Sequence, residues 1–297
     1  MKVNQLHARA KERAYYMYIN GDVQFNNDYS RYIAALEIEE HIENDKKINM
    51  KFQQWSDTEL LTENQINALK FINEKCKKRH FNVIRNLNSI VPKANALISK
   101  MFTDIPLYIN FPISHINKIA NDTHYRNQFE TGTSSGTLNR LSRSAWENRL
   151  FSDTYTDATD FERPKYGNFP INNQDAAIYR DINRRTTYYG LMYFVLKYEV
   201  KQRTTITYGD SNSQTYNTVG NFNYPCDILN DKSHVLSHIY THGYSSSATY
   251  FEIQIHGPVR LDTDIESLHY PSGCQCETMY NNAFELFKKK GIQLHTY

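Results

Sequence analysis

Residues 249–259 read T-Y-F-E-I-Q-I-H-G-P-V, and apolar and polar side chains alternate along them. Phe251, Ile253 and Ile255 fall on one side of an extended chain, and Glu252, Gln254 and His256 fall on the other. Alternation of this kind is typical of a β-strand. The stretch therefore predicts a strand with a carboxylate near its beginning, a residue type that ordinarily faces solvent.

Other segments also have strand character. Arg203–Tyr208 reads R-T-T-I-T-Y, is rich in β-branched residues and closes in the turn Gly209-Asp210-Ser211. The apolar run Tyr193–Val200 predicts a further strand. The polar segment 211–242 predicts a loop with a short helix at residues 235–240. The second half of the chain is therefore expected to be built mainly from strands.

The first half has helical patterns. Helices are expected at Gln5–Ile19, at Asp28–Ile42 before a polar break at Asp45–Lys47, from Thr62 to Arg79, at Lys93–Phe102, and near the end at Met279–Lys288. The sequence Thr62-Glu63-Asn64-Gln65 is a capping box, and a strand is expected to follow at His80–Arg85. We therefore predict an α+β chain, with a helical N-terminal region (residues 1–79) followed by a mainly antiparallel β core (residues 80–297).

Composition narrows the function classes. Among 297 residues, 34 are Lys or Arg and 32 are Asp or Glu, so bulk charge gives no argument for binding nucleic acid or an anionic membrane. No run approaches the ~18 apolar residues of a membrane span, and residues 1–21 lack the apolar block of a secretory signal. The chain has four cysteines. Cys274 and Cys276 form a close pair, but no second Cys/His pair stands at zinc-ligand spacing, which predicts reduced thiols and no metal.

Three further segments combine residues that bind ligands. Phe129–Gly136 contains glycines that allow close backbone approach, together with hydroxyls that bind amide or phosphate groups, but it has neither P-loop nor dinucleotide-fold spacing. Glu162–Asn168 holds an aromatic residue between basic residues and a glycine, and His80–Arg85 ends in a base. Each segment alone is more often structural than functional.

Together and in this order, the segments resemble a bacterial family catalogued only as a domain of unknown function. Its members carry Y-R-x-Q-F-E-T-G-x-S-x-G, R-P-K-Y-G-x-x-N, G-D-S and E-x-Q-x-H-G. The corresponding residues here are Tyr125–Gly136, Arg163–Gly167, Gly209–Ser211 and Glu252–Gly257. Two positions depart: the family's H-F-H-P-D-R becomes His80-Phe81-Asn82-Val83-Ile84-Arg85, and Pro170 stands where the pattern has Asn.

The same blocks are similar to the ADP-ribosyltransferase superfamily, and in particular to CteC-type ADP-ribosyltransferases. These bacterial effectors resemble poly(ADP-ribose) polymerases and modify a threonine of ubiquitin with an Asp–Glu pair. The resemblance implies an ADP-ribosyltransferase-like core at residues 80–297, NAD as substrate, no metal, and host ubiquitin as partner, with residues 1–79 as a possible ubiquitin-targeting part. It also implies a virulence effector or toxin that is secreted without a cleavable signal and acts in the host cytoplasm, where it blocks ubiquitination.

The resemblance assigns roles to individual residues. It implies that Glu252 is catalytic and that Asp210 is the second acid, with Asp153, Asp157 and Asp160 as rivals. Tyr166 is expected to stack on nicotinamide. The other residues expected to bind the cofactor are Arg85, Gly132, Thr133, Ser134 and Ser211.

The expected chemistry explains why carboxylates are needed. Cleavage of the nicotinamide–ribose bond develops positive charge at the anomeric carbon, and a carboxylate beside the ribose stabilises that charge, as in glycosidases. A threonine hydroxyl is a poor nucleophile at neutral pH, so a second carboxylate is useful as a general base. Two alternatives remain open: an NAD or glycoside hydrolase with paired carboxylates, and a non-catalytic interaction module with a Tyr-rich contact surface.

Overall fold

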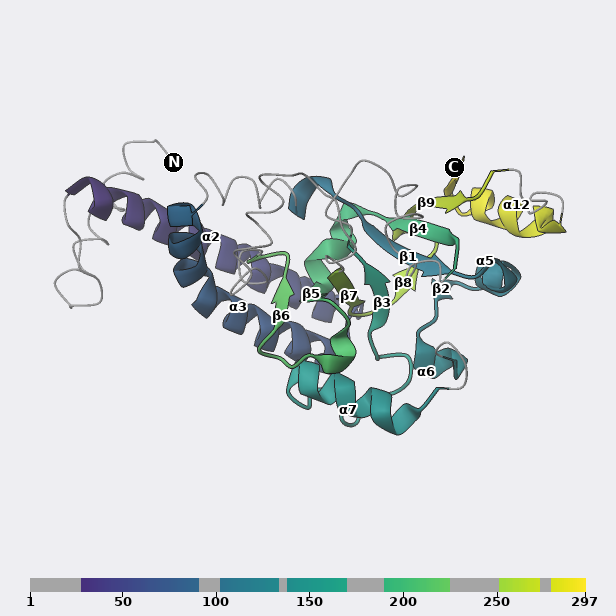
Figure 1. Cartoon of the computed structure of the whole chain (residues 1–297), viewed down its shortest axis with the longest axis horizontal. Coiled ribbons are helices and arrows are strands. Elements are labelled where there is room, and N and C mark those ends of the chain that lie inside the picture. The colour runs from purple at the N-terminus through teal and green to yellow at the C-terminus, as the bar shows by residue number, and fades with distance from the viewer. Residues whose placement is uncertain (1–27, 91–101, 134–137, 170–189, 225–250, 273–278) are drawn as a thin grey trace. The chain divides into compact units, whose positions relative to one another are not determined.

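The computed structural model in Figure 1 describes residues 28–90, 102–133, 138–169, 190–224, 251–272 and 279–297, with the backbone alone for 28–41 and 80–90. Contacts divide the chain into two compact units, Met1–Glu59 and Leu60–Tyr297. In the first unit, helix α2 spans Asp28–Asp57 without interruption. The predicted break at Asp45–Lys47 is wrong, because Asp and Lys are tolerated inside a helix and neither glycine nor proline stands there.

Helix α3, Glu63–Ile90, begins at the predicted capping sequence. The backbone N–H of Thr62 donates to Oε1 of Gln65 over 3.0 Å. The helix does not end at Arg79, so the strand predicted at His80–Arg85 is wrong. No glycine or proline interrupts residues 63–90, and isolated β-branched residues lower helix propensity only slightly. The boundary predicted between residues 79 and 80 falls inside this helix.

Eight strands of the described part form one sheet, in the order β10-β9-β4-β1-β3-β7-β5-β6. The strands are β1 (Leu107–Phe111), β3 (Lys165–Asn168), β4 (Met192–Leu196), β5 (Thr204–Tyr208), β6 (Val219–Asn221), β7 (Phe251–Ile255), β9 (Ile265–Tyr270) and β10 (Gln293–Thr296). Neighbouring strands are antiparallel, except that β10 runs parallel to β9. Mixed helix and strand with a large sheet confirms the predicted α+β class.

Several predicted strands correspond to observed ones. The strands expected at residues 203–208 and 250–256 are β5 and β7, and the run from Tyr193 begins β4 but turns into a 3-10 helix, η2, at Tyr198–Arg203. The segment expected to be a loop from residue 211 contains β6. A separate short pair joins β2 (His124–Tyr125) to β8 (Val259–Arg260).

Further helices occur within residues 80–297, where a mainly antiparallel β core was expected. The largest is α7, Arg140–Phe151, whose start is capped by the Asn139 side chain accepting from Ser142 N–H. The shorter helices are η1 (Ile113–His115), α5 (Ile116–Ala120), α6 (Gln128–Thr131) and η3 (Ser211–Ser213). The expectation of a mainly β core in residues 80–297 is therefore only partly right.

The apolar core lies on one face of the sheet. Cross-strand register places Ile109, Phe194, Ile206 and Ile253 among its buried residues. Helix α12, Asn281–Lys289, contributes Ala283, Phe284 and Phe287 to this core, as its predicted apolar face requires. Helices α5 and α12 pack on each other near β4 and β9 (Figure 1).

At the other end of the sheet, α3 lies along the edge strand β6 (Figure 1). The thiol of Cys76, which is buried and not in a disulfide, donates to the carbonyl of Val219 over 3.7 Å. Nη2 of Arg79 donates to the same oxygen over 3.4 Å, and Nη1 donates to the carbonyl of Asn217. Side chains of α3 therefore use backbone acceptors of the edge strand.

Some predictions fall outside the described residues. These are the helices expected at Gln5–Ile19, at Lys93–Phe102 (all but Phe102) and at residues 235–240, and the cysteines Cys226, Cys274 and Cys276. In the described ranges, no helix is long and apolar enough to cross a membrane.

Candidate functional site

Strand β7 lies between β3 and β5 and is buried on both of its faces. Phe251, Ile253 and Ile255 enter the apolar core, as their alternation predicts. The opposite face is covered as well: Glu252 is only 7% exposed and Gln254 is fully buried. Glu252 therefore does not face solvent as strand carboxylates ordinarily do, and burial of a carboxyl is favourable only when polar groups contact it.

Two side chains donate hydrogen bonds to Glu252. Nε2 of Gln254 lies 3.2 Å from its Oε1, and the Ser211 side chain also bonds to the carboxyl group. Burial raises the pKa of Glu252 to about 7, and the charge of Asp210 acts in the same direction, whereas the two hydrogen bonds and Arg143 oppose the increase. The carboxyl group is thus placed to change its ionisation near neutral pH.

The turn after β5 brings Asp210 and Ser211 to Glu252. Gly209 adopts a left-handed φ of +82°, which lets the chain turn directly after Tyr208. Oδ1 of Asp210 then accepts from Asn212 N–H over 2.9 Å and starts the short helix η3. In the part of the chain described here, Oδ2 of Asp210 has no hydrogen-bond partner. The structure thus brings three of the predicted site residues together.

Tyr166, a fourth predicted residue, lies on β3 opposite Gln254 and on the same face of the sheet. Its hydroxyl donates to Oε1 of Glu147 over 3.1 Å. Burial and the charge of Glu147 raise the pKa of Tyr166 well above its ordinary value, and Glu252 adds to the increase. The guanidinium of Arg143 lies 4.8 Å from the centre of the ring, so one face of this aromatic is already covered.

Glu147 was not among the predicted site residues. It lies on α7, is fully buried and forms an ion pair with Arg163, with 2.8 Å between Oε2 and Nη1. Burial raises the pKa of Glu147 to about 7, although Arg163, Arg143 and the Tyr166 hydroxyl all act to lower it. The spacing of Arg143 and Glu147, one helical turn apart, was the available sequence signal.

The segment around Gly132 packs against the same region through Arg163. Nδ2 of Asn127 donates to the backbone carbonyl of Arg163 over 2.9 Å, and the Arg163 guanidinium lies 4.5 Å from the centre of the Phe129 ring. The Asn127 side chain also caps α6, and Glu130 reaches back to its backbone N–H. The sequence blocks that begin at Tyr125 and Arg163 are therefore in direct contact.

Among the described residues, no contact joins Gly132 or Thr133 to Glu252. Gly132 ends α6 with a φ of +68°, and the exposed Thr133 bonds to the hydroxyl of Thr131 over 3.1 Å. Arg85 lies within α3 rather than at the end of a strand. Ser134 lies outside the described residues. Each of these four assignments to cofactor binding remains a prediction.

A chain of buried hydrogen bonds leads from Tyr155 through His256, Thr205 and Gln254 to Glu252. Nδ1 of His256 lies 2.6 Å from the Tyr155 hydroxyl, and Nε2 of His256 lies 3.1 Å from Oγ1 of Thr205. The Thr205 hydroxyl donates to Oε1 of Gln254 over 3.1 Å, and Nε2 of Gln254 donates to Glu252. Burial lowers the pKa of His256 to about 3, with contributions from Arg203 and Lys165, so the ring is neutral at physiological pH.

A neutral ring donates from only one of its two nitrogens, and one placement of that proton lets every bond in the chain form. If the Tyr155 hydroxyl donates to Nδ1, then Nε2 carries the proton and donates to Thr205, which is left free to donate to Gln254. Gln254 must then present its NH₂ group to Glu252. All four bonds are thereby satisfied in one direction, which holds the carboxyl group in a single orientation.

Among the described residues, no group of three or more His, Cys, Asp or Glu side chains is arranged to hold a metal ion.

Comparison with known protein families gives a partial match. Residues 113–231 are similar to a family described as "Protein of unknown function (DUF3626)". This range includes the blocks at Tyr125–Gly136, Arg163–Gly167 and Gly209–Ser211, and it ends before Glu252. No curated protein matches the chain.

Proposed function

We propose that the protein is an NAD-dependent mono-ADP-ribosyltransferase effector that modifies a threonine of host ubiquitin and so blocks ubiquitination. The resemblance of four ordered sequence blocks to CteC-type enzymes suggests this activity. The observation that supports it best is the environment of Glu252, a buried carboxyl group held by Ser211 and Gln254 beside a second acid, Asp210.

Glu252 has the main catalytic role in this proposal. When the bond between nicotinamide and ribose breaks, positive charge grows at the anomeric carbon, and the Glu252 carboxylate stabilises it while accepting a hydrogen bond from the ribose. A fixed orientation increases this effect, because the charge does not have to reorganise during the reaction. Ser211 and Gln254 provide that fixed orientation.

Asp210 acts on the acceptor. The threonine oxygen forms a bond to the anomeric carbon as the nicotinamide bond breaks, and the hydroxyl proton passes to the Asp210 carboxylate. One Asp210 oxygen caps η3, which holds the side chain in place. The other oxygen is the one that receives the proton.

Tyr166 is proposed to contact the nicotinamide ring. Because the Arg143 guanidinium covers one face of Tyr166, the nicotinamide stacks on the other face or against the ring edge. Release of neutral nicotinamide and transfer of ADP-ribose complete the reaction. The helical residues before residue 80 are the part that we propose to contact ubiquitin.

The direct test is the intact mass of ubiquitin after incubation with NAD and this protein. We expect a mass increase of one ADP-ribose, located on a threonine by fragmentation. Ubiquitin carrying alanine at the modified threonine is the matched control and should remain unmodified. An unchanged ubiquitin mass at high enzyme concentration would contradict the proposal.

The acid pair also favours a second candidate, an NAD glycohydrolase in which water replaces the threonine hydroxyl. Release of free ADP-ribose at the same rate with and without ubiquitin would support the hydrolase. Binding of ubiquitin with neither transfer nor hydrolysis would support the non-catalytic interaction module instead.

A further inference from the structure

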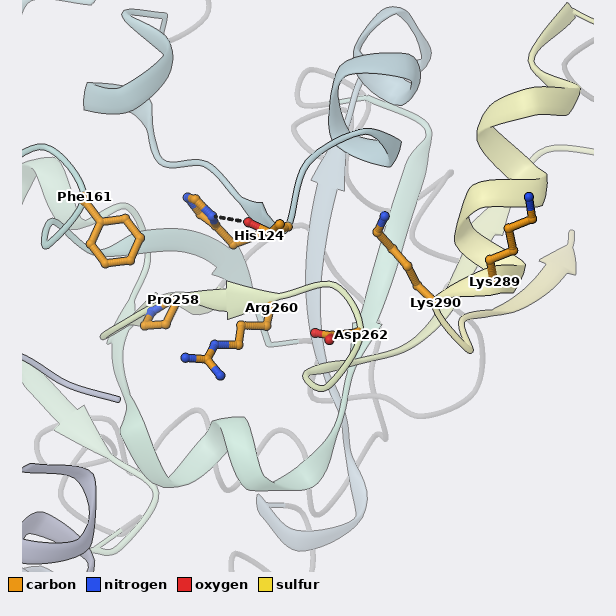
Figure 2. Close-up of a pocket in the computed structure, with 8 residues that line it drawn as sticks. His124, Phe161, Pro258, Arg260, Asp262, Lys289 and Lys290 are labelled. Atoms are coloured by element: carbon orange, nitrogen blue, oxygen red, sulfur yellow. Dashed lines mark hydrogen bonds between the residues drawn. The ribbon is translucent and has the colours of Figure 1, made fainter. Parts of the chain in front are cut away.

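A pocket of about 720 Å³ lies beside the residues that follow β7, since Pro258 and Arg260 are part of its lining (Figure 2). Its lining includes His124, Phe161, Arg260, Asp262, Lys289 and Lys290. Phe161 and His124 lie on one side and the two lysines on the other, with Arg260 and Asp262 between them (Figure 2). The volume is within the range of roughly 300–1,000 Å³ that is usual for small-molecule sites.

The charges that line this pocket are unbalanced. Arg260, Lys289 and Lys290 provide three positive charges against the single carboxylate of Asp262. Arg260 comes from β8 and the lysines from the end of α12, so two separate segments bring cations to one place. Helix dipole compensation explains lysines at the end of α12, but it does not explain Arg260.

Two other acids near the pocket, Asp264 and Glu130, already have partners. Asp264 pairs with Arg203 over 2.8 Å, and its Oδ2 also accepts from the backbone N–H of Arg260. Glu130 contacts His124 over 2.9 Å. In the ranges that the structure describes, no ion pair engages Arg260 or Lys289. The cationic groups therefore remain available to a ligand.

Lys290 is held in position at the rim. Its Nζ donates to the backbone carbonyl of Ala120 over 3.1 Å, which uses one of three N–H groups and fixes the direction of the side chain. Phe161 is 41% exposed and meets the His124 ring edge-to-face at 5.2 Å between centroids. A positioned ammonium and an exposed ring thus occupy opposite sides of one hollow (Figure 2).

We propose that this pocket binds the phosphate groups of a small molecule, with a pyrophosphate unit as the minimal ligand. Arg260 provides a planar fork that matches phosphate oxygens, and Lys290 and Lys289 provide point charges beside it. A hollow of this size, partly open to solvent, suits a compact anion better than an acidic peptide, which needs an extended surface.

The pocket is separate from the Glu252 site. Tyr166, on β3, lies on the same face of the sheet as Glu252. Its neighbour Lys165 points to the opposite face, and Nζ of Lys165 donates to the carbonyl of Phe161 over 2.7 Å. Arg260 follows β7 beyond its last residue. The proposal therefore does not depend on the proposed transferase activity.

Calorimetric titration of the full chain with inorganic pyrophosphate at low ionic strength tests the proposal. We expect saturable binding with one site per chain, weakened about tenfold or more in Arg260→Gln and in Lys290→Gln, because each variant removes a charged hydrogen-bond donor. Lys288→Gln is the matched control, since Lys288 is on the same helix but pairs with Glu285. It should bind as the wild type does.

Two further variants and a second ligand separate the possible outcomes of the titration. Glu252→Gln should bind pyrophosphate normally, which distinguishes this pocket from the transferase site. The Phe161→Ala variant tests for a nucleotide ligand within this class. Weaker binding of ADP-ribose by this variant, with unchanged binding of pyrophosphate, would support such a ligand. Undetectable pyrophosphate binding by the folded wild type would overturn the proposal. Equal weakening by Lys288→Gln and Lys290→Gln would also overturn it, because it would indicate general surface charge.

Discussion

The hydroxyl of Tyr155 lies 2.6 Å from Nδ1 of His256, and both side chains are fully buried. Their rings also stack, with 5.9 Å between centroids. This contact begins the hydrogen-bonded chain that passes through Thr205 and Gln254 to Glu252. A fully buried tyrosine thus stands at the start of a series of contacts that ends at the proposed catalytic carboxyl group.

Tyr155→Phe should destabilise the fold without changing its shape. The substitution removes only the hydroxyl and leaves Nδ1 of His256 buried without its donor, which costs about 1–3 kcal/mol. Urea unfolding measures the loss. Tyr198→Phe, at a side chain that is 52% exposed, is the control and should stay within about 0.5 kcal/mol of wild type. Equal losses in both variants would contradict the chain of hydrogen bonds.

Glu252→Gln should reduce NAD-dependent transfer to ubiquitin by about 10²–10³-fold, because it removes the charge that stabilises the developing cation while keeping the side-chain volume. Initial rates by mass spectrometry provide the measurement. Glu266→Gln replaces an exposed glutamate on β9 and should leave the rate unchanged. A Glu252→Gln enzyme with wild-type activity would exclude Glu252 as the catalytic residue.

The transfer rate should increase with pH through neutrality. Burial raises the pKa of Glu252 to about 7, and only the ionised form stabilises the cation, so the rate should grow about tenfold between pH 6 and pH 8. Initial rates at saturating NAD across this range test the prediction. A flat profile would show that ionisation of Glu252 does not limit the reaction.

The same pKa predicts how stability depends on pH. The folded-state pKa of about 7 lies above the ordinary value of 4.5, so the folded protein retains a proton that the unfolded chain has released between these values. The contribution of this retained proton to the free energy of unfolding is complete below pH 4.5 and is lost as the pH rises through 7. At pH 8, Glu252→Gln should therefore be more stable than wild type by at least about 1 kcal/mol.

Unfolding in urea at several pH values would check this. The difference between Glu252→Gln and wild type should shrink as the pH falls toward 4.5, where both side chains are neutral. A difference that is constant with pH would mean that Glu252 ionises at its ordinary value in the folded protein.

Removal of Arg163 should be far more costly than removal of an exposed arginine. Arg163→Met leaves Glu147 fully buried without its ion-pair partner, which costs about 3–5 kcal/mol. Arg126→Met breaks an exposed i,i+4 pair with Asp122 and should cost no more than about 1 kcal/mol. Chemical unfolding at pH 7.5 compares the two, and similar losses would contradict a structural role for the buried pair.

Local sequence patterns predicted local structure well. Strand β7 follows from the alternation at residues 251–256, and the start of α3 follows from the capping box at Thr62. The end of α3 could not be predicted in the same way, because no glycine or proline marks it and the helix continues beyond Arg79 to Ile90.

The candidate site was predictable only in part. Asp210, Ser211 and Glu252 were expected together and do meet. The burial of Glu252 depends on which elements cover its face of the sheet, and strand periodicity contains no such information. Glu147 was missed because its partners, Arg163 and Tyr166, lie on another segment, and α7 itself has a mostly polar sequence.

The contacts between α3 and β6 also affect how copies of the protein behave in crowded solution. An edge strand ordinarily has unpaired backbone N–H and C=O groups, to which a strand of another molecule can bind. At Val219, however, Cys76 and Arg79 already use the carbonyl oxygen. A neighbouring helix thus blocks intermolecular sheet growth here without a proline or a bulge, and aggregation through β6 would first require α3 to detach.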